Sequence, residues 1–138
     1  MNSKQVNFKK PLLIALAAVL AVSFGATSVA SATVKCKPNV RVINEKGASI
    51  KVLNFKYKIG TSTIYTEGLD NKIVAANGGT ENWPSQTLDD AANGVVITSS
   101  AVEFKDDTGS GYGPPRMSSW HPHSFVCGPT HNYIHTIQ

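Results

Sequence analysis

Apolar and polar residues alternate along most of the chain that follows Ala32, which is the pattern of half-buried β-strands. The clearest run covers 48–59, and its apolar members alternate with asparagine and lysine. They are Leu53, Phe55, Tyr57 and Ile59. Ile50 and Val52 fall out of phase with this set, so the start of the run is predicted to contain a β-bulge or to be buried on both faces.

A second clear strand is predicted over 95–105, directly after the turn pair Asn93-Gly94. Shorter strands are predicted at five further places, the weakest being 72–75: they are 40–44, 63–67, 72–75, 118–127 and 133–137. The stretch 81–90 shows no sustained period, and Ala91-Ala92 after it is compatible with one helical turn.

No segment after Ala32 repeats its apolar positions with the period of an α-helix. About seven short strands separated by frequent turns instead favour an all-β fold, a small antiparallel β-sandwich of immunoglobulin-like architecture. A small β-barrel is the alternative arrangement of the same strands.

The segment Met1–Ala32 has the three regions of a secretory signal peptide. A lysine-bearing start, Met1–Lys10, precedes an apolar run over 12–24, and small residues follow as far as an Ala-x-Ala pattern that ends at Ala32. The apolar run is shorter than the roughly 20 residues that span a bilayer. We therefore predict cleavage after Ala32, no stable membrane insertion afterwards, and an exported domain over 33–138, periplasmic or secreted.

Removal of the signal changes the charge of the protein. Lys4, Lys9 and Lys10 account for three of the 13 basic residues, so 10 basic residues remain against 9 acidic ones. A nearly neutral domain without a lysine–arginine cluster lacks the electrostatic footprint of a nucleic-acid-binding protein. The nearest approach to such a cluster is interpreted as the water-facing side of one strand: Lys51, Lys56 and Lys58.

The exported part of the chain contains two cysteines, Cys36 near its start and Cys127 near its end. In an oxidising compartment the simplest interpretation is one disulfide bond. Closing a loop of about 92 residues stabilises the fold by roughly 4–5 kcal/mol in the chain-entropy description. A redox or metal-binding role for the two thiols is the alternative, although no Cys-x-x-Cys motif supports it.

The four histidines all lie after Trp120, near the end of the chain: His121, His123, His131 and His135. His121 and His123 flank a proline, and on a strand such residues share one face at a separation of about 6.5–7 Å. With His131 or His135 from a neighbouring strand they are candidate ligands for copper or zinc. The alternative is that they are ordinary strand histidines, since no acidic residue follows Asp107 to support metal ligands.

The glycine-rich stretch 106–116 is predicted to be a loop between strands. It lacks the motifs of phosphate and dinucleotide loops, so it is either a flexible hairpin loop or a recognition loop. Tyr112 and Arg116 are residue types enriched in binding contacts. Trp83, next to Pro84, is a candidate exposed anchor outside this loop.

No nucleophile motif such as Gly-x-Ser-x-Gly occurs in the chain. The adjacent carboxylates Asp89-Asp90 and Asp106-Asp107 are interpreted as turn-forming groups rather than as a catalytic pair. We therefore predict a protein that binds rather than catalyses and that needs no cofactor. It is expected to be an inhibitor or immunity-type protein acting on another protein or a cell-surface component. The alternative is a periplasmic copper- or zinc-binding protein.

Overall fold

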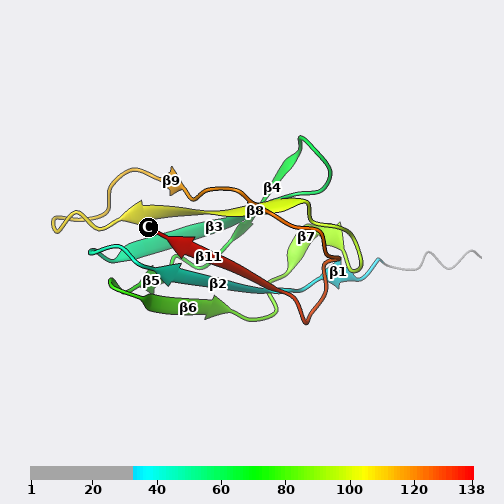
Figure 1. The fold of residues 1–138 in the computed structure, drawn as a ribbon, viewed down its shortest axis with the longest axis horizontal. Helices are drawn as coiled ribbons and strands as arrows, with labels where there is room; N and C mark the ends of the chain where they lie inside the picture. Colours follow the sequence, from blue (N-terminus) through cyan, green and yellow to red (C-terminus); the bar gives the residue numbers. More distant parts are fainter. Residues whose placement is uncertain (1–32) are drawn as a thin grey trace, which may run out of the picture. The chain divides into compact units, whose positions relative to one another are not determined.

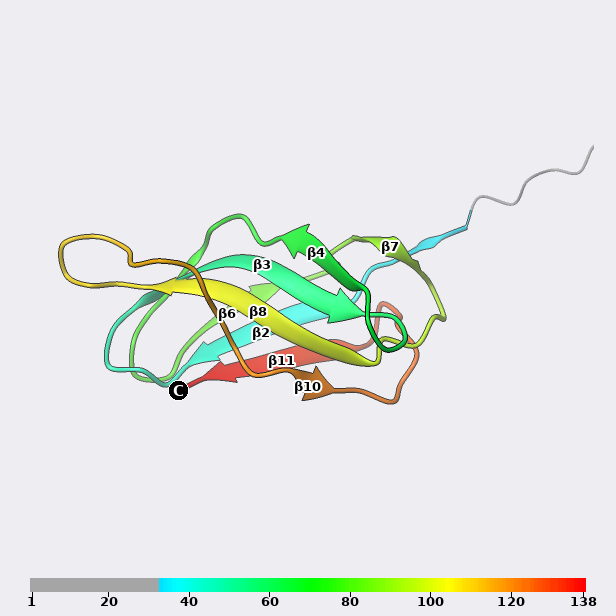
Figure 2. The ribbon, with the colours of Figure 1, turned by 90° about the horizontal axis from the view of Figure 1, so that it is seen from above.

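Two β-sheets of unequal width pack face to face around one apolar core (Figure 1 and Figure 2). The structure is a computed structural model and describes residues 33–138. The fold is all-β, as predicted, and its sheets stay open, so the alternative of a closed barrel is wrong.

The larger sheet runs in the order β10-β8-β3-β4, and two short strands extend it, β5 beside β3 and β9 beside β8. Its strands are β3 (Ile50–Lys58), β4 (Ile64–Gly68), β5 (Ile73–Val74), β8 (Ser99–Asp106), β9 (Arg116–Met117) and β10 (His121–Pro122). All of their pairings are antiparallel.

The smaller sheet runs in the order β11-β2-β6, and a separate two-stranded sheet joins β1 to β7. These strands are β1 (Lys35–Cys36), β2 (Asn39–Asn44), β6 (Gly79–Trp83), β7 (Leu88–Ala92) and β11 (Asn132–Ile137). The last strand, β11, pairs with β2 in parallel, which the expectation of an antiparallel sandwich did not include.

The core lies between the inner faces of the two sheets. Phe55 of β3 packs against Tyr133 of β11 with their ring centroids 5.4 Å apart, so these rings join the two layers. Other fully buried members come from both sheets and from their connections: Val40, Val42, Ile50, Val52, Leu69, Val74, Leu88, Ile97 and Val102.

The two strongest strand predictions are confirmed, since 48–59 contains β3 and 95–105 covers all of β8 except its last residue, Asp106. The predicted irregularity near the start of β3 is also confirmed, because its register with β8 shifts between Val52 and Asn54. That shift places Ile50 and Val52 on the same buried side as Phe55. The helical turn at Ala91-Ala92 is wrong, since both residues belong to β7, which pairs with β1.

The predicted signal peptide, 1–32, lies outside the described residues. The described residues, 33–138, belong to one compact unit. No helix in the described part of the chain is long and apolar enough to cross a membrane.

Candidate functional site

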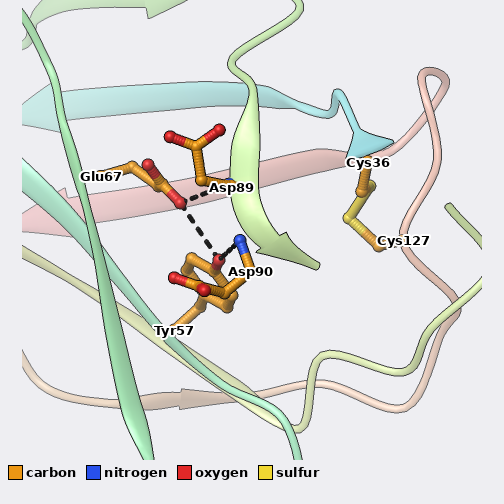
Figure 3. Close-up of a disulfide and its surroundings, with 6 residues drawn as sticks. All are labelled: Cys36, Tyr57, Glu67, Asp89, Asp90 and Cys127. Atoms are coloured by element: carbon orange, nitrogen blue, oxygen red, sulfur yellow. Dashed lines mark hydrogen bonds between the residues drawn. A yellow bond between two sulfur atoms is a disulfide. The ribbon is translucent and has the colours of Figure 1, made fainter. Parts of the chain in front are cut away.

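The disulfide bond joins Cys36 of β1 to Cys127 in the segment that leads into β11 (Figure 3). The two Cα atoms are 5.9 Å apart, a usual separation for a bridge, and both residues are buried. The prediction of one structural disulfide is therefore confirmed. Within 33–138 no cysteine remains free for thiol chemistry.

A buried polar group beside the disulfide anchors β7 to the larger sheet (Figure 3). The hydroxyl of Tyr57 donates to Oε1 of Glu67 at 3.1 Å, and it accepts the backbone N–H of Asp90 at 3.3 Å. The same Glu67 oxygen accepts the backbone N–H of Asp89 at 2.6 Å. Burial raises the pKa of Tyr57 above its usual range, so the hydroxyl keeps its proton and the group is structural.

Trp83 is not the exposed anchor that the sequence suggested. Its side chain belongs to the core with an exposed fraction of 3%, and its Nε1–H donates to the backbone oxygen of Leu69 at 2.8 Å. The sequence suggested an exposed loop residue because Pro84 follows directly. In the structure Trp83 is the last residue of β6, and its side chain points inward from that strand.

The predicted loop 106–116 is held in one shape by its own hydrogen bonds. Oδ1 of Asp107 accepts the backbone N–H of Gly109 at 2.8 Å, and the N–H of Thr108 donates to the oxygen of Gly111 at 2.8 Å. The bond from Gly109, followed by one from the Ser49 hydroxyl, lowers the pKa of Asp107. These bonds give the loop a defined turn structure, and a recognition role for it stays a prediction.

Tyr112 and Trp120 lie next to lysines on the outer face of the larger sheet. Nζ of Lys51 sits 4.3 Å from the ring centroid of Tyr112, and Nζ of Lys58 sits 4.5 Å from that of Trp120. Both distances are within the range of cation–π attraction. The segment after β8 thus lays two aromatic rings beside the lysines of β3.

We define the lysine face as the outward side chains Lys51, Lys56, Lys58 and Lys105. Lys51 of β3 and Lys105 of β8 occupy directly opposed positions, so two like charges face each other across the strand pair. Glu103 is the carboxylate on this face, and its Oε2 lies 3.5 Å from Nζ of Lys56. The sequence placed three of these lysines on one strand but gave no sign of Lys105, since only strand pairing brings it there.

Arg116 lies at the margin between the two sheets rather than on the lysine face. Its Nη1 is 2.9 Å from Oδ2 of Asp106, while Nζ of Lys46 is 2.7 Å from the other oxygen of the same carboxylate. The bond from Lys46, followed by that from Arg116, lowers the pKa of Asp106. Lys46 and Arg116 also line a pocket of about 200 Å³.

Three of the four histidines come together around Ser100, a fully buried residue of β8. Oγ of Ser100 lies 2.6 Å from Nε2 of His123 and 3.1 Å from Nε2 of His135. The ring of His121 meets that of His135 edge to face at a centroid distance of 5.1 Å. His131 stands apart from this group and stacks on Phe125 at 4.6 Å.

Ser100 has one proton to donate, so its two imidazole neighbours must play different roles. The shorter contact assigns that proton to the bond with His123, because O–H donors form the shorter bonds. Nε2–H of His135 then donates to Ser100, and Nδ1 of His135 carries a lone pair. That Nδ1 is buried and has no hydrogen-bond partner among the described residues.

Burial, and then repulsion from His121 and His123, lowers the pKa of His135 to about 3. Burial, followed by the charge of His121, also lowers the pKa of His123. His123 and His135 are therefore neutral at ordinary pH. The Ser100 hydroxyl is enclosed by its two histidines and is fully buried, so it is not placed to attack a substrate.

The copper or zinc hypothesis named His121, His123 and His131. Across 33–138, no group of three or more histidine, cysteine, aspartate or glutamate side chains is arranged to hold a metal ion. Metal binding therefore stays a prediction from the sequence alone. Ser100 is the member of the histidine group that the sequence did not reveal, since it lies far from His121 along the chain and meets it only through the pairing of β8 with β10.

Comparison of the chain with protein-family models, with curated proteins and with solved structures gives no match.

Proposed function

We propose that this protein is an exported binding protein whose lysine face docks on a negatively charged partner, either another protein or a cell-surface component. The observation that carries the proposal is the separation of charge. Four lysines share one sheet face with the carboxylate of Glu103, although basic and acidic residues nearly balance over 33–138. A partner that supplies negative charge would complement this face.

The opposed pair Lys51 and Lys105 is the strongest part of this argument. Like charges directly opposite each other on neighbouring strands destabilise a sheet. No carboxylate within 33–138 forms an ion pair with either lysine. An anionic group bound between the two lysines would remove this repulsion, and the relief of repulsion would favour binding.

The surroundings of the lysine face have the composition of a binding surface. Tyr112 and Trp120 lie beside two of its lysines, and Ile64 and Met117 expose 50% and 41% of their surfaces at its border. Aromatic residues and methionine are enriched in interfaces. The loop 106–116, for which a flexible hairpin and a recognition loop are the two interpretations, contributes Tyr112 to this surface.

The disulfide supports an oxidising and hence exported location for the domain. Together with the signal-like segment Met1–Ala32, it supports a periplasmic or secreted protein that meets its partner outside the cytoplasm. An inhibitor or immunity-type protein is the class that fits a small, disulfide-bonded domain acting by contact alone.

The test measures retention of the 33–138 domain on immobilised heparin, a generic polyanion, in a salt gradient. The expected result is retention that falls as salt rises, and earlier elution of the double variant Lys51→Gln, Lys105→Gln. Lys35→Gln, Lys72→Gln is the matched control. It removes the same charge from lysines paired with Asp89 and Glu81 elsewhere. Equal elution of the two double variants would overturn the proposal.

A further inference from the structure

β11 offers one edge to β2 and leaves the other edge free. The backbone N–H of Asn39 donates to the oxygen of His131 at 2.9 Å, and that of Glu45 donates to the oxygen of Ile137 at 2.8 Å. Backbone groups of successive strand residues point to opposite edges. The odd-numbered residues of this segment therefore bond to β2.

The backbone groups of Asn132, Ile134 and Thr136 consequently point to the opposite edge of β11. No strand of the described chain pairs with β11 on that side. Ile134 also exposes 47% of its surface. A row of unpaired N–H and C=O groups with an exposed β-branched residue is a template for a further strand.

This edge has none of the usual features that prevent strand pairing. Residues 132–137 contain no lysine, arginine, acid or proline, and three of the six are β-branched. Other edge strands do carry charged residues: β6 has Glu81, which pairs with Lys72, and β4 has Glu67. Charges and prolines are the residues that natural edge strands use against unwanted pairing.

The larger sheet extends past β11 on this same side. β9 and β10 pair with the edge of β8 that faces away from β3, and in Figure 2 β10 lies beyond β11 at the margin of the domain. The ring of His121, on β10, already meets the ring of His135 edge to face. A strand added to β11 would therefore lie beneath β9 and β10, in the place that the narrower sheet leaves unfilled.

The pocket of about 200 Å³ lies at this place, beside the C-terminal end of β11. Ser118 and Ser119 line it from the segment between β9 and β10, and Thr136 lines it from β11. Lys46 and Arg116 line it as well. Both of these cations contact the one carboxylate of Asp106, so these three side chains together carry one positive charge.

We infer that the free edge of β11 binds an extended segment of a partner protein by strand addition, with a carboxylate of that segment held by Lys46 and Arg116. Main-chain hydrogen bonds to Ile134 and Thr136 supply the affinity, and the two cations select an acidic residue at one end. This surface is separate from the lysine face, so the inference does not depend on the proposed function.

The probe is a capped octapeptide of alternating threonine and valine that carries two aspartates at one end. Sister peptides carry the aspartates at the other end, or lysines in their place. The measurement is amide hydrogen exchange of the 33–138 domain by NMR, with and without peptide. The amides of Ile134 and Thr136 are expected to exchange rapidly in the free domain and about tenfold or more slowly with the preferred acidic peptide.

Two variants make the test specific. Ile134→Pro removes an outward N–H without removing a bond to β2, and Ile134→Lys adds an edge charge that leaves the backbone intact, so it serves if the proline variant does not fold. Ile134→Pro is expected to weaken peptide binding about tenfold, the loss that one missing hydrogen-bond contact produces. Ile134→Lys is expected to weaken it as well, because it places a charged side chain beside the added strand. Arg116→Gln is expected to weaken the aspartate peptides and to leave an uncharged threonine–valine peptide unchanged.

Two outcomes would overturn the inference. One is the absence of any protection at Ile134 and Thr136 with all peptides. The other is protection without peptide that grows with protein concentration, which would identify a second copy of this chain as the partner. The double variant Lys51→Gln, Lys105→Gln is expected to bind the peptides normally, so failure here and failure of the proposed lysine face give different results.

Discussion

Nε2 of His135 lies 3.1 Å from Oγ of Ser100, and both residues are fully buried in the layer between β8 and β11. His135 is therefore a histidine whose neutral form the folded protein requires. A buried imidazole of this kind links the stability of the domain to pH.

Stability is expected to fall as the solution becomes acidic. The unfolded chain binds a proton at His135 near the ordinary pKa of 6.5, whereas the folded protein does so only at a pKa of about 3. The contribution is therefore complete above pH 6.5 and is lost as the pH falls from there towards 3. For His135 alone the slope is about 1.4 kcal/mol per pH unit. Urea unfolding at about pH 7.5 and about pH 5 measures it.

The variant His135→Gln is expected to show a smaller loss of stability between these two pH values, while His131→Gln keeps the wild-type dependence. His131 stacks on Phe125 outside the serine-centred group, which makes it the matched control. An unchanged pH dependence in His135→Gln would show that other groups cause the acid sensitivity.

Ser100→Ala is expected to destabilise the fold by about 1–3 kcal/mol, because it leaves buried nitrogens without their partner. The wild-type hydroxyl serves both His123 and His135. Ser99→Ala changes the neighbouring residue, which points to the other face of β8, and is expected to cost less than about 0.5 kcal/mol. Urea unfolding at neutral pH compares the two, and equal losses would contradict the role of the hydroxyl.

Tyr57→Phe is expected to cost about 1–3 kcal/mol, because Glu67 loses a donor and the Asp90 N–H loses an acceptor. Tyr65→Phe is the control, since Tyr65 stacks on the Tyr57 ring at 5.4 Å and its ring is kept. Thermal unfolding followed by circular dichroism measures both. A Tyr57→Phe domain as stable as the control would remove the anchor assigned to β7.

Reduction of the bond between Cys36 and Cys127, 91 residues apart, is expected to lower stability by about 2–5 kcal/mol. Unfolding midpoints with and without a strong reductant give the difference. The double variant Cys36→Ala, Cys127→Ala is expected to unfold like the reduced protein and to ignore the reductant. If the reductant still lowers its midpoint, the effect does not arise from this disulfide.

Gly79→Ala is expected to be strongly destabilising, by about 3 kcal/mol or more. A Cβ at this position would collide with the backbone oxygen of Ala75, which cannot move aside as a side chain can. Gly47→Ala is the control, because a Cβ there meets nothing within 4 Å. Denaturant unfolding of both variants checks the difference, and similar midpoints would contradict the close approach at Gly79.

The strands were predictable wherever one face is buried and the other is wet. The alternation in 48–59 and 95–105 led directly to β3 and β8, and even the phase break at Ile50 and Val52 marked a real shift of register. The prediction failed at β6 and β7. These short strands contain polar residues such as Thr80 and Asp89 and lack a clear apolar pattern, and they form through pairing with β2 and β1.

The candidate sites divide in the same way. The sequence by itself determined the all-β class, the single disulfide and the presence of a loop at 106–116, which carries Tyr112. These features depend on residue type and spacing. Only the tertiary structure decided that Trp83 is buried, that Lys105 opposes Lys51 and that Ser100 joins His123 to His135. Each of these depends on which strands become neighbours, and long-range packing of the whole core selects those neighbours rather than any local pattern.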